Sequence, residues 1–444
     1  MEGMNTFTPR DVSQTVLGLA KIVKHVRYAD PGSPFRDVLL DGDREPRKDV
    51  FRAFARAALS LRGFDGQGLS NVAYAYAIAG FTNQHTLFDH LERLFVLRMK
   101  SFTPQELSNI AWAFAKTGKS SPALFRAVTR AVLDSDLASF SPQGFSNIVW
   151  AYAKAGVSSP RLFQKVARAV VARDLNTFTV QEIANIVWAY AKAEASSPPL
   201  FEKMTRPVVT RNLNAVKPQN LSNIVWAYAT AAECSPRLFQ KVTQALLARD
   251  LLAFKPQEMS NIVWAYAKAG ASSPRLFQTA ARAVVARDLD AFAPQNLSNI
   301  VWAYAKAGES HPPLFQKVAR AVVARDLAPF APQNLANVAW AYAKAGQSQP
   351  CLFQKIARAV VARDLTTFTS QNLVNIVWAY AKAGVSSSRL FATIALALSK
   401  RQRELNSQDA ADISWAYSTA GVVILDGPSN VKASHPPQLK STPA

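Results

Sequence analysis

Apolar and polar positions repeat along most of this chain with one fixed period. An asparagine recurs every 38 residues, and an aromatic residue follows three positions later in each copy. The asparagines are Asn71, Asn109, Asn147, Asn185, Asn223, Asn261, Asn299, Asn337 and Asn375. The aromatic residues are Tyr74, Trp112, Trp150, Trp188, Trp226, Trp264, Trp302, Trp340 and Trp378. A fixed period of roughly 20–50 residues is typical of one stacked supersecondary unit, so the sequence predicts a solenoid.

Each copy is predicted to hold two α-helices, helix A and helix B. Ser141 and Pro142 suit the N-cap and first position of helix A, and Gly156 suits the residue just past its end. The same cap-and-proline signal at Pro160 begins helix B, which is expected to run to about Asp174. No strand pattern competes with these signals. The predicted fold class is therefore all-α: an αα-solenoid, a superhelical array of about ten helix pairs.

The two ends of the array depart from the pattern. Residues 1–63 are interpreted as a degenerate N-terminal capping repeat with an insert, and residues 64–400 as the regular array. Residues 401–421 are interpreted as a degenerate C-terminal capping repeat, and residues 422–444 as a disordered tail. Atypical end copies suit a stack whose terminal units must face solvent.

Helix A carries a polar stripe. At about 100° per residue, Gln143, Asn147 and Lys154 fall on one side, while Tyr152 falls opposite and is expected in the core. Stacking aligns the stripe into ladders along one surface, expected to be the concave one. For the flanking Trp150, a core position between units and a base-stacking role both stay open. The asparagine suits a hydrogen-bond ladder or a ligand contact, and the lysine a solvated helix-end cation or a phosphate contact.

Composition then narrows the choice of partner. Lysine and arginine number 51 against 30 acidic residues, a net charge of +21, which favours a polyanion and nucleic acid ahead of a membrane. The five histidines are scattered, and Cys234 and Cys351 lie in separate repeats. This arrangement predicts neither a disulfide framework nor a catalytic or metal constellation. We expect no enzyme activity, no cofactor, no metal, no membrane partner and no small-molecule substrate.

One position beside the stripe varies among otherwise similar units. The residue after the glutamine is Gly68, Glu106, Gly144, Glu182, Asn220, Glu258, Asn296, Asn334 or Asn372. Capping boxes account for Glu106 and Glu182, which follow a threonine at the cap position. That account does not extend to Asn220, Asn296 and Asn334, because the cap position three residues earlier holds lysine or alanine. A variable position on a constant scaffold suits readout of one base per repeat.

The candidate RNA-binding residues are the polar stripe and the variable-position asparagines. They are Gln105, Asn109, Lys116, Gln143, Asn147, Lys154, Gln181, Asn185, Lys192, Gln219, Asn220, Asn223, Gln257, Asn261, Lys268, Gln295, Asn296, Asn299, Lys306, Gln333, Asn334, Asn337, Lys344, Gln371, Asn372, Asn375 and Lys382. Helix B has a basic face of its own, including Arg161, Lys165 and Arg168. That face is interpreted either as a solvated outer surface or as a second site.

The segment Phe102–Lys116 reads FTPQELSNIAWAFAK, and at its 38-residue period it resembles the octatricopeptide repeat. It is also similar to the leucine-rich region of FAST-kinase-like proteins and to RNA-editing substrate-binding complex proteins, over roughly residues 64–400. The resemblance implies a sequence-selective single-stranded RNA-binding protein of a mitochondrion or chloroplast, acting in transcript stability, processing or translation. It also implies other organellar RNA-processing proteins as partners and a right-handed array. Because the first 43 residues do not look like a transit peptide, the organelle follows from the resemblance alone.

An armadillo-like scaffold that binds a protein or peptide without RNA is the alternative. Armadillo repeats also present asparagine and tryptophan from one helix per unit. Their period is usually longer, at roughly 40–47 residues, and grooves that bind basic peptides are acidic. The net charge of +21 therefore favours RNA.

Two neighbouring units are expected to be the weakest part of the array. Glu194 and Ala232 stand where other units have a closing glycine, and Pro207 lies inside a helix B. A non-glycine residue in a left-handed cap costs on the order of 1 kcal/mol, and an interior proline roughly 3 kcal/mol. The sequence therefore predicts reduced stability and a kink around residues 194–232.

Overall fold

The computed structural model describes residues 7–28, 40–41, 45–46, 48–119, 121–233, 235–271, 273–347, 349–424 and 431–433. These residues form paired α-helices joined by short turns, together with two small antiparallel strand pairs. They divide into two compact units, residues 1–211 and 212–444. The predicted all-α solenoid of helix pairs is confirmed.

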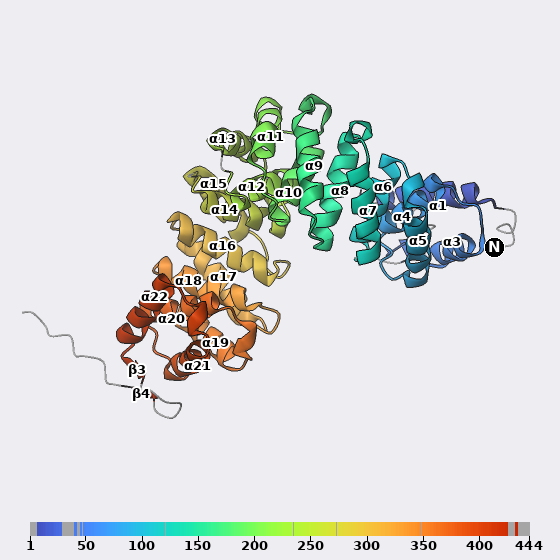
Figure 1. The fold of residues 1–444 in the computed structure, drawn as a ribbon. Coiled ribbons are helices and arrows are strands. Elements are labelled where there is room, and N and C mark those ends of the chain that lie inside the picture. Colours follow the sequence, from blue (N-terminus) through green and yellow to red (C-terminus); the bar gives the residue numbers. More distant parts are fainter. Residues whose placement is uncertain are drawn as a thin grey trace, which may run out of the picture. The chain divides into compact units, whose positions relative to one another are not determined.

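The N-terminal unit contains two layers of helices (Figure 1). In the A layer each helix packs closely on the next one: α1 (Pro9–Tyr28), α4 (Gly66–Ala79), α6 (Pro104–Lys116), α8 (Pro142–Ala155) and α10 (Val180–Lys192). The helices of the B layer pack less extensively on one another: α3 (Lys48–Ser60), α5 (His85–Leu97), α7 (Pro122–Asp134), α9 (Pro160–Val171) and α11 (Pro198–Thr210). Strands β1 (Leu40–Asp41) and β2 (Glu45–Pro46) pair within the insert between α1 and α3.

The C-terminal unit repeats this plan. Its A layer consists of α12 (Pro218–Thr230), α14 (Pro256–Ala269), α16 (Pro294–Ala307), α18 (Pro332–Lys344), α20 (Ser370–Lys382) and α22 (Ser407–Thr419). Its B layer consists of α13 (Pro236–Leu247), α15 (Pro274–Val285), α17 (Pro312–Ala324), α19 (Pro350–Val361) and α21 (Ser388–Ser399). Beyond α22, strands β3 (Val422–Ile424) and β4 (Val431–Ala433) form an antiparallel pair. The rest of the predicted tail, residues 425–430 and 434–444, lies outside the described residues.

The helix ends follow the local sequence. The Ser141 hydroxyl accepts a hydrogen bond from the Gly144 amide at 3.0 Å, and Gly156 closes α8 with a φ of 67°. Helix α9 ends at Val171 rather than at the expected Asp174. The Asp174 carboxylate instead accepts from the Asn176 amide at 3.0 Å and caps a 3-10 turn over Leu175–Thr177. The connector between successive repeats is therefore a capped turn rather than the end of helix B.

In most A-layer helices a buried tyrosine bonds the B layer of the preceding repeat, whereas α6 has Phe114 at this position. In the N-terminal unit the Tyr152 hydroxyl donates to the Phe125 carbonyl at 2.9 Å, and the two rings meet edge to face at 5.0 Å. In the C-terminal unit Tyr342 donates in the same way to the Phe315 carbonyl at 2.6 Å. Burial raises the pKa of both hydroxyls above the usual value near 10. The phenol therefore stays a neutral donor in the fold.

The two expected glycine replacements do adopt left-handed backbone. Glu194 has a φ of 52° and Ala232 a φ of 57°, the only non-glycine residues with positive φ in the described part of the chain. Pro207 is buried inside α11, which continues without a break to Thr210. The boundary between the two compact units, after Arg211, falls within this segment. Reduced stability and a kink there remain predictions.

Restoring glycine at these two positions should stabilise the protein. We expect Glu194→Gly and Ala232→Gly each to raise the free energy of unfolding by on the order of 1 kcal/mol, because the strain of a side chain at positive φ is relieved. Thermal or denaturant unfolding of each variant measures the effect. Gly156→Ala is the matched control, since a Cβ there would meet nothing within 4 Å and only the backbone changes. Unchanged stability in all three variants would show that φ at these caps carries no strain.

Candidate nucleic-acid interface

Two rows of exposed polar side chains run along the A layer of each unit. The glutamine row consists of Gln105, Gln143 and Gln181 in the N-terminal unit and Gln219, Gln257, Gln295, Gln333 and Gln371 in the C-terminal unit. The lysine row consists of Lys116, Lys154 and Lys192, and of Lys268, Lys306, Lys344 and Lys382. Eleven residues separate the two rows on each helix, which corresponds to about 16 Å of rise and nearly whole turns. The rows therefore lie side by side on the same face.

The side chains of both rows are free to meet a ligand. Within the described ranges, no ammonium of the lysine row makes an ion pair or a hydrogen bond to protein. In the glutamine row, the only amide bonded to protein among the described residues is that of Gln371, which donates to Asn375 at 3.2 Å. The lysine row therefore presents several uncompensated positive charges in register.

The repeated asparagines lie between the rows and are less accessible. Asn147 is buried, whereas Asn109 and Asn299 are half-buried. Among the described residues, no hydrogen bonds link these asparagines from one repeat to the next. Their contribution to a ligand contact remains a prediction.

The tryptophans form a closed column on the same face. In the C-terminal unit, successive rings from Trp226 to Trp415 have centroids 6.1–6.4 Å apart and interplanar angles of 29–37°. A base inserted between two rings would need two stacking distances of about 3.4 Å each, or about 6.8 Å. Such spacing instead suits direct ring contact, worth about 0.5–1.5 kcal/mol per pair. Of the two interpretations, the geometry favours a column between repeats, in which the rings are half-buried except that of Trp415, which is exposed.

At the variable position, several asparagines act as capping groups, which corrects part of the sequence interpretation. Asn334 is only 8 % exposed; its Oδ1 accepts from the Ala331 amide at 3.0 Å, and its Nδ2 donates to the Ser298 hydroxyl at 3.2 Å. Asn296 makes the equivalent bonds to Ala293 and Ser260. The conclusion that capping does not extend to Asn296 and Asn334 is therefore wrong. An asparagine can bond back to the cap residue's backbone whatever side chain that residue carries.

The amide of Asn334 should matter for stability rather than for base recognition. We expect Asn334→Ala to lower the free energy of unfolding by about 1–2 kcal/mol, because the Ala331 amide and the Ser298 hydroxyl lose their partner. RNA sequence preference should not change. Asn334→Glu is the matched control, because Glu106 accepts from its cap amide at 2.7 Å at the equivalent position. A shift in base preference with Asn334→Ala at full stability would return this position to the recognition surface.

Part of the basic charge of the B layer holds the repeats together. The Arg211 guanidinium donates to the Phe178 and Leu175 carbonyls of the preceding connector at 2.5 and 2.9 Å. Lys165 donates to the carbonyls of Leu133 and Ser135 at the end of the preceding helix. Sequence reasoning missed these contacts and counted Lys165 in a basic face. The exposed positions of that face include Arg161 and Arg168.

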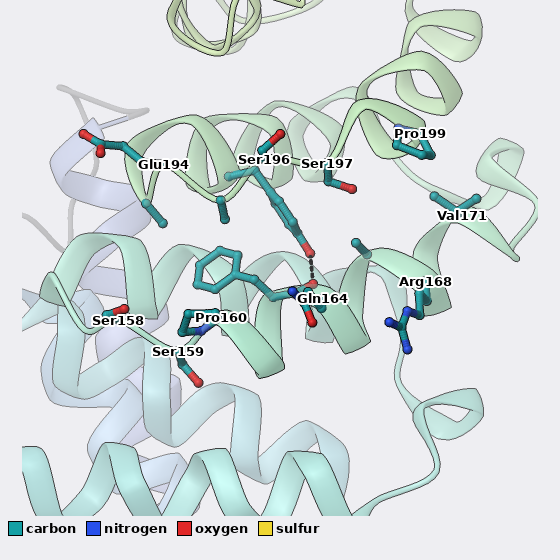
Figure 2. Close-up of a pocket in the computed structure, with 15 residues that line it drawn as sticks. Ser158, Ser159, Pro160, Gln164, Arg168, Val171, Glu194, Ser196, Ser197 and Pro199 are labelled. Atoms are coloured by element: carbon teal, nitrogen blue, oxygen red, sulfur yellow. Dashed lines mark hydrogen bonds between the residues drawn. The ribbon is translucent and has the colours of Figure 1, made fainter.

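Cavities open between neighbouring helices of the B layer. Figure 2 shows one of about 600 Å³ between α9 and the start of α11, lined by Pro160, Gln164, Arg168, Glu194 and Pro199 among others. A smaller cavity of about 380 Å³ recurs between α13 and α15 in the C-terminal unit. These openings follow from the looser packing of the B layer. No group of three or more histidine, cysteine or acidic residues that could hold a metal occurs in the part of the chain that the structure describes.

Comparison with known proteins gives one match to a family. Residues 281–424 match the model of the RNA-editing substrate-binding complex 6 protein. The resemblance expected from the repeat motif is confirmed over that segment. No curated protein matches the sequence. None of the described helices is long and apolar enough to cross a bilayer.

Three known structures align with most of this chain at low similarity. Yeast Rmd9p in complex with a 16-nucleotide target RNA has 8 % identity and a TM-score of 0.40, over 92 % of this chain and 85 % of that one. A homology model of the AP-3 complex has 11 % identity and a TM-score of 0.28, over 94 % and 70 % of the two chains. A circular tandem repeat protein has 12 % identity and a TM-score of 0.19, over 93 % and 98 %. At these scores the three structures say nothing about function.

Proposed function

We propose that the protein binds single-stranded RNA along the A layer, with phosphates on the lysine row and bases toward the glutamine row. The observation that carries this proposal is the pair of exposed, parallel rows, of which one holds uncompensated charge in register. Lysines that neutralise phosphates release counterions and supply most of the affinity for a nucleic-acid strand. Neutral amides beside them suit hydrogen bonds to base edges. We expect this face to be the concave one, because the A-layer helices pack more closely than those of the B layer.

The resemblances support the same function and suggest its setting. The matching family is named for binding the substrates of RNA editing. The match spans the seven helices from α16 to α22 in the C-terminal unit. We infer a role in transcript stability, processing or translation in an organelle, with a mitochondrion favoured by the RNA-editing resemblance. With one nucleotide per regular repeat, the nine copies give a footprint of about nine nucleotides.

A scaffold for a protein or peptide is the second candidate. Its support is the repeated asparagine and tryptophan on one helix per unit. A basic peptide is disfavoured because the lysine row would repel it, so the partner would have to be acidic. An acidic peptide and RNA would both use the lysine row, and direct binding separates them.

Equilibrium binding of the intact protein tests the proposal. A labelled single strand longer than the expected footprint is titrated at several salt concentrations between about 50 and 200 mM, with the same sequence as a duplex for comparison. We expect the single strand to bind more tightly than the duplex and the logarithm of affinity to fall linearly with the logarithm of salt, by roughly 0.7 per phosphate contact. No binding of the single strand at the lowest salt would overturn the proposal.

A further inference from the structure

The face that would meet the strand is nearly the same in every regular repeat. The glutamine row has no exception from Gln105 to Gln371, and the lysine row is interrupted between them only by Thr230. Where the variable position is asparagine, Asn296, Asn334 and Asn372 are buried and accept from the cap amide, whereas Asn220 is half-buried. Where it is glutamate, the carboxylate bonds the cap amide, at 2.7 Å for Glu106.

Variation elsewhere on the A layer lies away from the stripe. The cap position is exposed and differs among repeats, with Ser141, Lys255 and Ala293 as examples. At about 100° per residue this position lies about 120° around the helix from the repeated asparagine. A strand between the glutamine and lysine rows would therefore meet the same side chains in each repeat.

An unvarying face cannot encode a varied sequence. Repeat proteins that read one base per unit do so with two or three side chains that change from unit to unit. Here each nucleotide would be offered the same glutamine, asparagine and lysine. The strand that uses all of these contacts at once is a run of one nucleotide.

The chemistry of the glutamine row indicates which nucleotide. Among base-edge pairings, asparagine and glutamine match adenine N6 and N7, arginine and lysine match guanine, and carboxylates match cytosine. The row consists of primary amides throughout, and in the described residues all but Gln371 are free of protein hydrogen bonds. The amide offers a carbonyl acceptor for the adenine N6 amine and an N–H donor for N7.

We propose that the preferred ligand is a single-stranded run of adenosines, bound by the same contacts in successive repeats. The inference rests on the proposed function and specifies its substrate. A run longer than the footprint offers several equivalent registers, so affinity should keep rising with length beyond the footprint.

Competition among homopolymers tests the inference with the intact protein. Oligo(A), oligo(U), oligo(C) and a mixed strand of equal length compete for binding at one salt concentration. We expect oligo(A) to bind at least about tenfold more tightly than oligo(U) or oligo(C), since one bidentate base contact discriminates by about 1–3 kcal/mol. Equal affinity for all four strands, or a preference for another base, would overturn the adenosine inference while leaving RNA binding intact. Failure to bind any strand would overturn the proposed function as well.

A triple variant locates the preference. Gln257, Gln295 and Gln333 changed to alanine should reduce the preference for oligo(A) and leave the salt dependence unchanged. The matched control changes the exposed B-layer residues Gln278, Gln316 and Gln354 to alanine, and should keep the preference. All six side chains are exposed, so thermal unfolding of both variants should match the parent protein. An oligo(A) preference that survives in the first variant would exclude the glutamine row as its source.

Discussion

Changing Lys268, Lys306 and Lys344 to alanine is expected to weaken the binding of every single-stranded RNA by roughly 50-fold near physiological salt. Each lysine is exposed and has no protein partner among the described residues, so each can neutralise one phosphate. The salt dependence should flatten by roughly 0.7 logarithmic units per lost contact, or about two units in all. Equilibrium titration across salt concentrations measures both quantities. Base preference should remain, because phosphate contacts carry no sequence information.

The control for this experiment lies in the same repeats. Arg282, Arg320 and Arg358 are exposed on helices α15, α17 and α19, and their change to alanine removes the same net charge. If RNA follows the A layer, this variant should lose only a small part of the affinity through the long-range field. Equal losses in the two triple variants would mean that overall charge, rather than the lysine row, binds RNA. A larger loss in the arginine variant would place the strand on the B layer.

Raising the pH above 10 is expected to unfold the C-terminal unit over a narrow range. Burial raises the pKa of five of its tyrosines, Tyr266, Tyr304, Tyr342, Tyr380 and Tyr417. In the unfolded chain each phenol ionises near pH 10, whereas in the fold it stays protonated. The contribution to stability is therefore complete below pH 10 and is lost as the pH rises toward the folded-state pKa. Above pH 10, each tyrosine should lower the free energy of unfolding by about 1.4 kcal/mol per pH unit. The five together should lower it by on the order of 7 kcal/mol per pH unit.

Denaturant unfolding at pH values between about 9 and 11, a range centred on the ordinary tyrosine pKa near 10, measures this dependence. Tyr304→Phe removes one ionising group together with its bond to the Phe277 carbonyl. The variant should be less stable at neutral pH by about 1–2 kcal/mol and should show a shallower alkaline slope by about 1.4 kcal/mol per pH unit. An unchanged slope in this variant would show that the tyrosine does not ionise on unfolding.

Local sequence signals predicted the ends of helix A well. Ser141, Pro142 and Gly156 act through backbone groups a few residues away, so the sequence contains all that the motif needs. The left-handed conformation of Glu194 and Ala232 was predictable for the same reason, because neighbouring repeats place glycine at that position. The burial of the tyrosines followed from their place opposite the polar stripe.

Contacts between repeats were much less predictable. Arg211 bonds the Phe178 carbonyl 33 residues earlier, and its sequence context looks like an ordinary basic helix end. From the sequence alone, Asn334 looks like an exposed polar residue. Its bond to the Ser298 hydroxyl of the preceding repeat is visible only in the structure. The separation of the tryptophan rings likewise depends on how closely A-layer helices pack. Each of these features is set by the spacing of neighbouring repeats, which the composition of a single repeat does not specify.

Ultraviolet cross-linking of bound RNA, followed by mass spectrometry of the attached peptides, tests most directly whether RNA lies along the A layer. The account predicts cross-links in successive A-layer helices, within Pro256–Ala269, Pro294–Ala307 and Pro332–Lys344. The half-buried tryptophan rings and the side chains of the lysine row are the expected points of attachment. Cross-links confined to the B-layer helices Pro274–Val285, Pro312–Ala324 and Pro350–Val361 would contradict it.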